Sequence, residues 1–169
     1  MKLNDQVKRQ LLVNIIEFVT TATTGNTKDF GDLVKTRRGG AGCSNSVRAV
    51  FGTGYIAPAP SNTASSEVDF IAIATTGNAD DFGDSMVSKS LPGCCASSTR
   101  GIFAGGQPGA SPYYITDIEY VITSSGGGSN DFGDLQKGSL HTLDARRGSP
   151  AGSNDSTRGL IAGGNTPGD

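Results

Sequence analysis

The chain has 169 residues, with 14 Lys or Arg and 16 Asp or Glu, which gives a formal net charge of −2. Nucleic acids and anionic membranes attract proteins with a strong positive excess, so this charge argues against general binding to either. Hydrophobic residues make up 35%, and the 25 Gly follow no Gly-X-Y period, which is typical of many short strands joined by tight turns rather than of collagen.

Residues 1–13 form a distinct N-terminal segment. Leu3, Val7 and Leu11 recur at helical spacing, which predicts a short amphipathic helix that docks on this chain or on a neighbouring subunit. A peripheral membrane role is the alternative reading. Charges throughout the segment argue against a signal peptide, and the following "LLVNIIEFV" is too short and too polar to span a bilayer.

The sequence Asp-Phe-Gly-Asp then occurs three times, at 29–32, 81–84 and 131–134. In protein kinases an Asp-Phe-Gly holds magnesium, but it occurs once and follows a glycine-rich loop, a strand lysine and an HRD loop, none of which this chain has. The Phe residues of the motif lie 52 and 50 residues apart. The chain is therefore built from a repeat unit of about fifty residues.

The sequence of each unit predicts four strands. Alternating segments at 16–26, 68–78 and 118–128 come before the motif, and an apolar segment follows it, with Leu33 and Val34, Met86 and Val87, or Leu135. Runs of small residues lie at 41–45, 93–97 and 151–155, and segments from an Arg to closely spaced glycines lie at 48–54, 100–106 and 158–164. No helical periodicity follows the N-terminal segment, so residues 14–169 are predicted to be all-β.

Four strands in about fifty residues match a kelch propeller blade, and the small-residue strand suits the crowded innermost place. Complete blades are predicted at 40–87 and 92–136. The third blade is split between residues 15–34 and 150–164.

Three segments carry a resemblance to a known family: "RGIFAGG", "DIEYV" and "ARRGSPAG". They resemble kelch repeats, and their order is similar to kelch-like arrays in phage structural proteins, particularly those of marine cyanobacterial phages with "TTGN…DFGDL" runs. The resemblance implies a β-propeller and a non-enzymatic role in a virion, in the tail or on the capsid surface. Outside a virion, the expectation would be a soluble protein of unknown location.

Three blades are too few to close a propeller, which has roughly four to eight. We expect a head-to-tail dimer in which each chain completes the split blade of the other, making a ring of six. A partner virion protein that supplies the missing blades, or a trimer with nine, is the alternative.

The recurring residues are predicted to be structural. The Phe residues should pack between blades, the Gly residues of the motif permit a positive φ or a bulge, and the second Asp residues should cap turn amides or pair with a repeated Arg. These positions are Phe30, Phe82, Phe132, Asp32, Asp84, Asp134, Arg48, Arg100, Arg158, Gly54, Gly106 and Gly164.

Candidate binding residues lie elsewhere. Arg37, Lys89 and Arg147 precede the innermost strand, where exposed cations would line one mouth of the ring and could bind an anion. Irregular loops are predicted at 55–67, 107–117 and 135–145, and loops on rigid scaffolds commonly carry recognition. Their contact-ready residues are Tyr113, Tyr114 and His141. The alternative function is therefore a carbohydrate- or receptor-binding propeller, lectin-like or active on glycans.

No metal, cofactor or catalytic group is predicted. The Asp-rich turn "NADDFGD" lacks EF-hand spacing, and a single His cannot build a multi-histidine copper site. Cys43, Cys94 and Cys95 lack zinc-site spacing, so we interpret them as small buried apolar residues. The repeated acids Glu17, Asp69 and Glu119 share one strand position, which makes them poor candidates for an acid and base pair.

Overall fold

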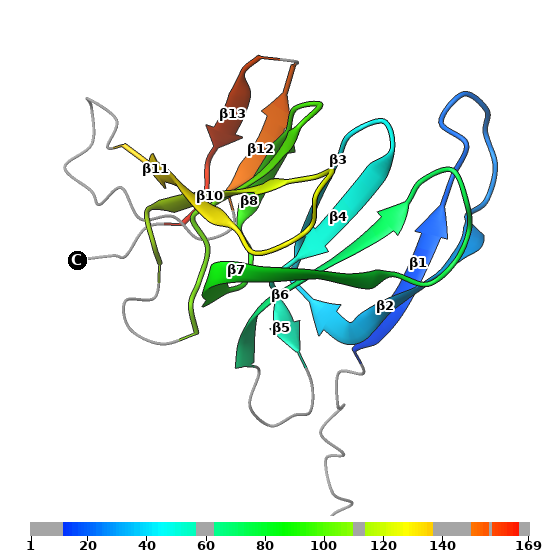
Figure 1. The fold of residues 1–169 in the computed structure, drawn as a ribbon, viewed down its shortest axis with the longest axis horizontal. Helices are drawn as coiled ribbons and strands as arrows, with labels where there is room; N and C mark the ends of the chain where they lie inside the picture. The colour runs from blue at the N-terminus through cyan, green and yellow to red at the C-terminus, as the bar shows by residue number, and fades with distance from the viewer. Residues whose placement is uncertain (1–11, 57–62, 110–113, 137–149, 156, 166–169) are drawn as a thin grey trace, which may run out of the picture.

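The computed structural model describes residues 12–56, 63–109, 114–136, 150–155 and 157–165. Within these residues every regular element is a β-strand and every strand pairing is antiparallel, which confirms the all-β prediction (Figure 1). This part of the chain contains no helix long and apolar enough to cross a membrane. The helix predicted near the N-terminus falls on residues 1–11, outside the described residues.

Two sets of four strands, called the first and second sheets below, form the centre of the molecule, and in each the strands lie side by side in chain order. The first set is part of a seven-stranded sheet that also contains the N-terminal hairpin and one short strand, and the second is a separate four-stranded sheet. The first sheet contains β3 (Ala41–Ser44), β4 (Arg48–Gly52), β6 (Thr63–Ala72) and β7 (Asp80–Lys89). The second sheet contains β8 (Gly93–Ala96), β9 (Arg100–Ala104), β10 (Asp117–Ile122) and β11 (Asn130–Asp134).

One two-stranded hairpin comes before this pair of sheets in the chain, and another comes after it. The N-terminal hairpin is β1 (Val13–Phe18) with β2 (Lys28–Arg38), and the C-terminal hairpin is β12 (Ala151–Asn154) with β13 (Gly159–Ala162). The short strand β5 (Tyr55–Ile56) pairs with the ends of β2 and β6, and so joins the N-terminal hairpin to the first sheet.

The small-residue strands of the three units lie next to one another, with β8 between β3 and β12. The Cys94 thiol donates to the Gly42 carbonyl across this contact at 2.8 Å. A Cβ added at Gly152 would overlap the Cys94 carbonyl oxygen, so the backbones approach too closely for a larger residue. The composition of these strands thus allows neighbouring sheets to converge there.

The core lies between the faces of successive sheets. Val50, Val68 and Phe82 of the first sheet pack against Phe103 and Val121 of the second, and all five are at most 4% exposed. Burying a large apolar side chain contributes about 1.5–3 kcal/mol, so this cluster is the main apolar contact between the sheets.

The N-terminal hairpin packs on the first sheet in the same way. Ile16 and Phe30 of the hairpin contact Ile71 and Ala79, with Phe51 at the edge of the cluster. Each junction therefore uses the Phe of one unit against the strands of the next unit.

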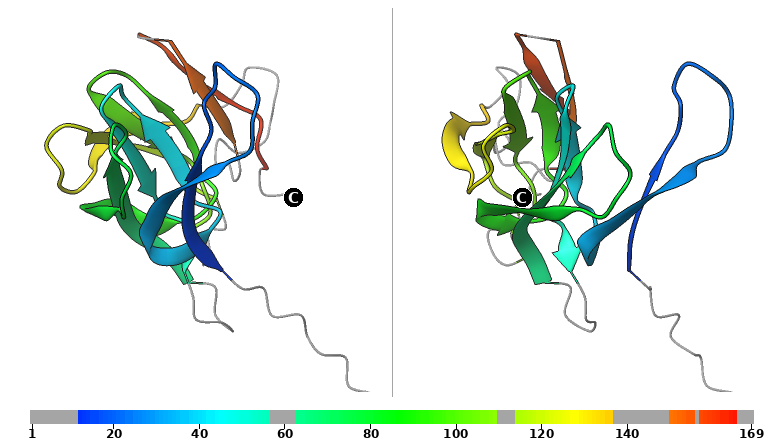
Figure 2. Two further views of the ribbon diagram at one scale, coloured as in Figure 1. Left: turned by 90° about the vertical axis from the view of Figure 1, so that its right-hand side faces the viewer. Right: turned by 45° about the vertical axis from the view of Figure 1, so that its right-hand side comes forward.

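The two hairpins do not pair with each other. β1 lies at the end of its sheet order, and within the described ranges β13 pairs with β12 alone. Figure 1 and the right-hand view of Figure 2 show the two hairpins apart from each other. The first and last strands of the described chain thus each have a free edge.

Two details of the strand predictions are wrong. The fourth strand was expected after Asp-Phe-Gly-Asp, but β2, β7 and β11 all contain the motif. A register shift opposite each Phe, with a glycine at positive φ after it (132° at Gly83), lets the ladder continue through the motif. The loop predicted at 55–67 contains β5 and the start of β6, because these two strands pair with each other.

Candidate functional site: the junctions between units

Backbone hydrogen bonds join each unit to the next at the same repeat positions. Gly77 N donates to Phe30 O at 2.7 Å, and Ala79 N donates to Asp32 O at 2.8 Å. At the next junction the donors are Gly127 N and Ser129 N, and the acceptors are Phe82 O and Asp84 O, at 2.7 and 2.8 Å. The turn before each motif therefore docks on the motif of the preceding unit.

This docking requires a glycine in the motif. A Cβ added at Gly83 would lie 2.6 Å from the backbone of Gly127, and one at Gly31 would overlap the Gly77 carbonyl. Gly133 has a similar φ of 131°, but an added Cβ there would meet nothing within 4 Å. The third motif thus has the same backbone shape without a neighbouring turn.

A buried ion pair also joins each unit to the next. Arg37 at the end of β2 pairs with Asp69 in β6, and Lys89 at the end of β7 pairs with Glu119 in β10, both with N–O distances of 2.8 Å. All four side chains are at most 4% exposed. The prediction that Arg37 and Lys89 are exposed cations at a channel mouth is therefore wrong, because the acid of the following unit covers each of them.

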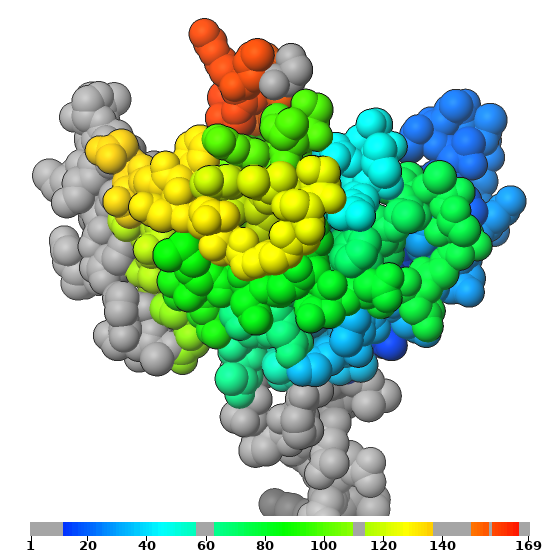
Figure 3. All heavy atoms as spheres, viewed as in Figure 1, coloured from blue at the N-terminus to red at the C-terminus, as the bar shows by residue number. Residues whose placement is uncertain are grey.

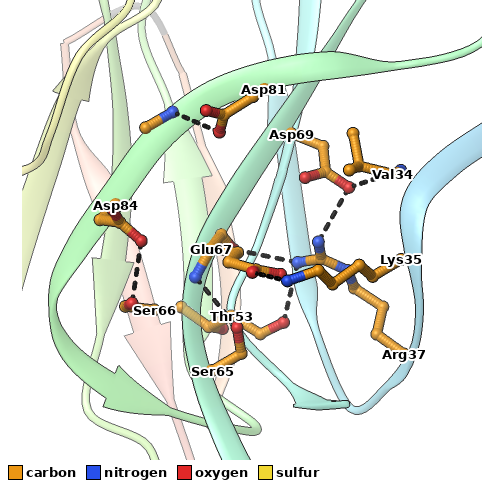
Figure 4. Close-up of polar contacts among 11 residues, drawn as sticks. Val34, Lys35, Arg37, Thr53, Ser65, Ser66, Glu67, Asp69, Asp81 and Asp84 are labelled. Atoms are coloured by element: carbon orange, nitrogen blue, oxygen red, sulfur yellow. Dashed lines mark hydrogen bonds and ion pairs between the residues drawn. The ribbon is translucent and has the colours of Figure 1, made fainter. Parts of the chain in front are cut away.

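The Arg37 guanidinium makes several contacts at once (Figure 4). Its Nη1 donates to the carbonyls of Thr53 and Glu67 at 3.0 Å, while Nη2 contacts Asp69 Oδ2. The same Asp69 oxygen accepts the Val34 amide at 3.2 Å. Arg37 therefore ties the N-terminal hairpin to both β6 and the turn after β4.

The Glu119 carboxylate collects more donors than Asp69 does. Besides Lys89, it accepts the hydroxyls of Ser85 and Ser129 and the amides of Met86 and Val87. Four of these five donors come from β7, the last strand of the first sheet. The carboxylate thus holds the two sheets together.

The two acids respond differently to their surroundings. Burial raises the pKa of Asp69, because it outweighs the Arg37 charge and the Val34 amide. Burial would also raise the pKa of Glu119, but the Lys89 charge and the Ser129 and Ser85 hydroxyls together exceed it and hold the pKa below the ordinary 4.5. The larger set of donors explains the difference.

The lowered pKa of Glu119 predicts a loss of stability in acid. A depressed folded-state pKa contributes stability that is complete above the unfolded value and disappears as the pH falls through the folded value. We expect the free energy of unfolding to fall below about pH 4.5, and Glu119→Gln to fall less steeply there. Urea titrations at a series of pH values measure both slopes. Equal acid slopes for the two proteins would show that Glu119 is not the group responsible.

The repeated Arg residues do not pair with the motif Asp residues, contrary to one of the two predicted roles. The Arg48 guanidinium lies 4.8 Å from the Phe70 ring centroid, and Arg100 lies 4.5 Å from that of Tyr120. Among the described residues the ion pairs are Lys35–Glu67, Arg37–Asp69 and Lys89–Glu119.

Two of the second Asp carboxylates of the motif accept hydroxyls. Asp84 accepts Ser66 Oγ and Asp134 accepts Thr116 Oγ1, at 2.9 and 2.8 Å. At the first motif, it is the Asp32 amide N–H that makes a side-chain contact, donating to Asn78 Oδ1 at 3.1 Å. It is the first Asp of the motif that caps an amide: Asp81 accepts Gly83 N, and Asp131 accepts Gly133 N.

The other predicted positions are spread over the chain. Tyr114 is half-buried, and Tyr113, His141 and Arg147 fall outside the described residues. Gly54, Gly106 and Gly164 all have positive φ, at 96°, 114° and 95°. Cys95 is buried, Cys43 and Cys94 are half-buried, and no disulfide joins them.

Burial raises the pKa of all three thiols, that of Cys43 to about 12. They are therefore poor nucleophiles. No group of three or more His, Cys, Asp or Glu side chains comes together to hold a metal in the described part of the chain.

The junction that would follow the second sheet is incomplete. Phe132 is 52% exposed, whereas Phe30 and Phe82 are at most 7% exposed. Glu17 is also exposed, although its counterparts Asp69 and Glu119 are 2% exposed. The second sheet and the N-terminal hairpin thus present, at the two ends of the array, the same residues without the contacts that bury their counterparts.

Sequence reasoning missed the ion pairs, although a signal was present. Each repeated cation precedes a repeated acid by 32 or 30 residues, from Arg37 to Asp69 and from Lys89 to Glu119. Opposite charges repeating at a fixed offset indicate a contact between successive units. No protein-family model and no curated protein sequence matches this chain.

Proposed function

We propose that this chain is a non-enzymatic structural protein that assembles by sharing a β-propeller blade with another chain. In this proposal the N-terminal hairpin of one chain and the C-terminal hairpin of the next together make one four-stranded blade. The observation that carries it is the pair of free edges on β1 and β13. In both complete sheets, the strands at these two places pair with each other.

The complete sheets give the register of the proposed pairing. In the first sheet Phe51 lies opposite Asp69, and in the second Phe103 lies opposite Glu119. The corresponding pair is Ile161 of one chain opposite Glu17 of the other. This arrangement covers two unpaired edges, which would otherwise be templates for aggregation.

The size of the ring follows from the number of units. In this proposal each chain supplies two complete four-stranded blades and, with its two terminal hairpins, two half blades. Propellers have roughly four to eight blades, so two chains that share two blades make an acceptable six. A head-to-tail contact that closes in this way forms a ring rather than a filament.

The roles of the recurring residues support a structural function. The motif backbone, the glycines, the buried ion pairs and the Phe residues all take part in contacts between units. The resemblance of the repeats to phage kelch-like arrays supports a place in a virion, in the tail or on the capsid surface.

The mass of the protein in solution tests the assembly. Light scattering is expected to give twice the chain mass of 17.3 kDa, because each chain needs a second one to pair its free strands. The same sample in concentrated guanidinium should give the single-chain mass. A folded protein that stays soluble as a single chain at high concentration would refute the proposal.

A further inference from the structure

A cavity of about 370 Å³ lies between the second sheet and the C-terminal hairpin. Its apolar lining includes Ile102 of β9, Ile118 of β10, Phe132 of β11 and Ile161 of β13. In Figure 3 the yellow β11 and the orange C-terminal hairpin lie on neighbouring parts of the surface. An apolar space with exposed aromatic lining is a docking site rather than a filled core.

The repeat shows which residue is missing from this cavity. Its four apolar residues correspond, one unit earlier, to Val50, Val68, Phe82 and Phe103. In the complete junction those four enclose Val121, which is fully buried. The counterpart of Val121 in the remaining unit is Val19, directly after β1, and it is 52% exposed.

The opposite face of the chain lacks the reciprocal residue. Around the N-terminal hairpin, Ile16, Phe30, Phe51 and Ile71 correspond to Val68, Phe82, Phe103 and Val121. The position of Val50 has no occupant there. Its counterpart is Leu160 on β13, which is 63% exposed.

Side-chain size agrees with this pairing. At the two junctions within the chain, Cys43 lies against Gly101 and Cys95 lies against Gly159, with an added Cβ only 2.5 Å from each sulfur. The third pair of positions is Ser153 with Ala49. A residue with a Cβ therefore faces the smaller hydroxyl instead of the larger thiol, so the third junction can close to a similar distance.

We infer that the occupant is a second copy of this chain, whose Val19 fills the cavity while Leu160 of the first copy completes the Ile16 and Phe30 cluster of the second. The inference rests on the proposed assembly and names the side chains that hold it together. Each shared blade then supplies both missing core residues, Val19 to the junction on one side and Leu160 to the junction on the other, one from each chain.

Charge substitutions at the two positions test this interlock. Val19→Arg or Leu160→Arg would bury an unpaired charge, so we expect each to raise the dissociation constant of the assembly by about 30-fold or more. Val34→Arg and Met86→Arg are matched controls, since these residues are 50% and 61% exposed and occupy one repeat position on the outer strand. Both controls should associate like the wild type.

A mixing experiment checks the head-to-tail arrangement. A ring of two chains has two shared blades. In a ring of one Val19→Arg chain and one Leu160→Arg chain, one shared blade is free of both changes and the other carries both. We expect the mixture to associate more tightly than either variant alone. Circular dichroism shows whether each variant is folded, and Val19→Ala should give a smaller weakening if an Arg variant does not fold.

The outcomes separate this inference from the assembly it rests on. If the wild type forms a ring and Val19→Arg associates as tightly as Val34→Arg, the interlock is wrong and the assembly stands. If the wild type is a single chain at every concentration, both are wrong. A mixture that associates no better than its components would overturn the head-to-tail pairing.

Discussion

Replacing Glu119 with Leu is expected to lower the free energy of unfolding by about 3–5 kcal/mol, because the change leaves a buried charge without its partner. The Lys89 ammonium is 0% exposed, and Glu119 is its ion-pair partner. The Val87 amide would lose its acceptor as well, and the Met86 amide would keep only Ser129 Oγ. The chain has no Trp, so urea denaturation followed by circular dichroism is the suitable measurement.

Two further variants show whether the unpaired charge is the cause. Lys35→Met removes a partner from the exposed Lys35–Glu67 pair, where the Lys side chain is 51% exposed, and should change stability little. The double variant Lys89→Met with Glu119→Leu should recover part of the loss, since no charge stays buried. A Glu119→Leu protein as stable as Lys35→Met would contradict the buried pair.

Gly83→Ala is expected to destabilise the folded chain by about 1–3 kcal/mol more than Gly133→Ala. The two glycines have φ of 132° and 131°, so the conformational strain of an added Cβ is matched. They differ in what the Cβ meets, which is the Gly127 backbone at 2.6 Å for Gly83 and nothing within 4 Å for Gly133. Denaturation of the two variants below the concentration at which chains associate measures the difference.

The same pair of variants has a second readout. In the proposed ring, Gly25 of another copy docks on the third motif as Gly77 and Gly127 dock on the first two. Gly133→Ala should then weaken association between chains. In the single chain, it should lower the free energy of unfolding only by the conformational strain of the added Cβ. Equal stability of Gly83→Ala and Gly133→Ala would show that the close approach at Gly83 is not limiting.

The strands could be predicted from the sequence because their signals are local. Alternation around Phe70, small residues around Cys94 and glycine pairs after Phe103 all depend on neighbours within a few residues. The start of the fourth strand could not be predicted, since Asp-Phe-Gly-Asp reads as a turn. Its continuation as a strand depends on a bulge opposite the motif Phe and on the docked turn of the next unit.

The burial of the charged residues at the junctions also could not be predicted from the sequence. Arg37 and Lys89 follow polar residues near strand ends, which is typical of solvated positions. Their burial depends on an acid about thirty residues later in a different sheet. The residues near each cation contain no information about that contact. The spacing between cation and acid, compared across the units, is the signal that indicates it.

Some repeat positions are exposed although their counterparts are buried. Val19, Phe132 and Leu160 occupy repeat positions that belong to the core at the complete junction, and the sequence predicts burial for the repeated Phe. The structure places them on free faces, at 52%, 52% and 63% exposure. In the proposed assembly, a second chain supplies the neighbour that these faces lack.

An experimental density map of the protein at assembly concentration tests the shared blade most directly. The account predicts a closed ring in which β13 of each chain pairs with β1 of the next and Ile161 lies opposite Glu17 of its neighbour. A map in which β1 and β13 pair within one chain, or in which both edges face solvent, would contradict it.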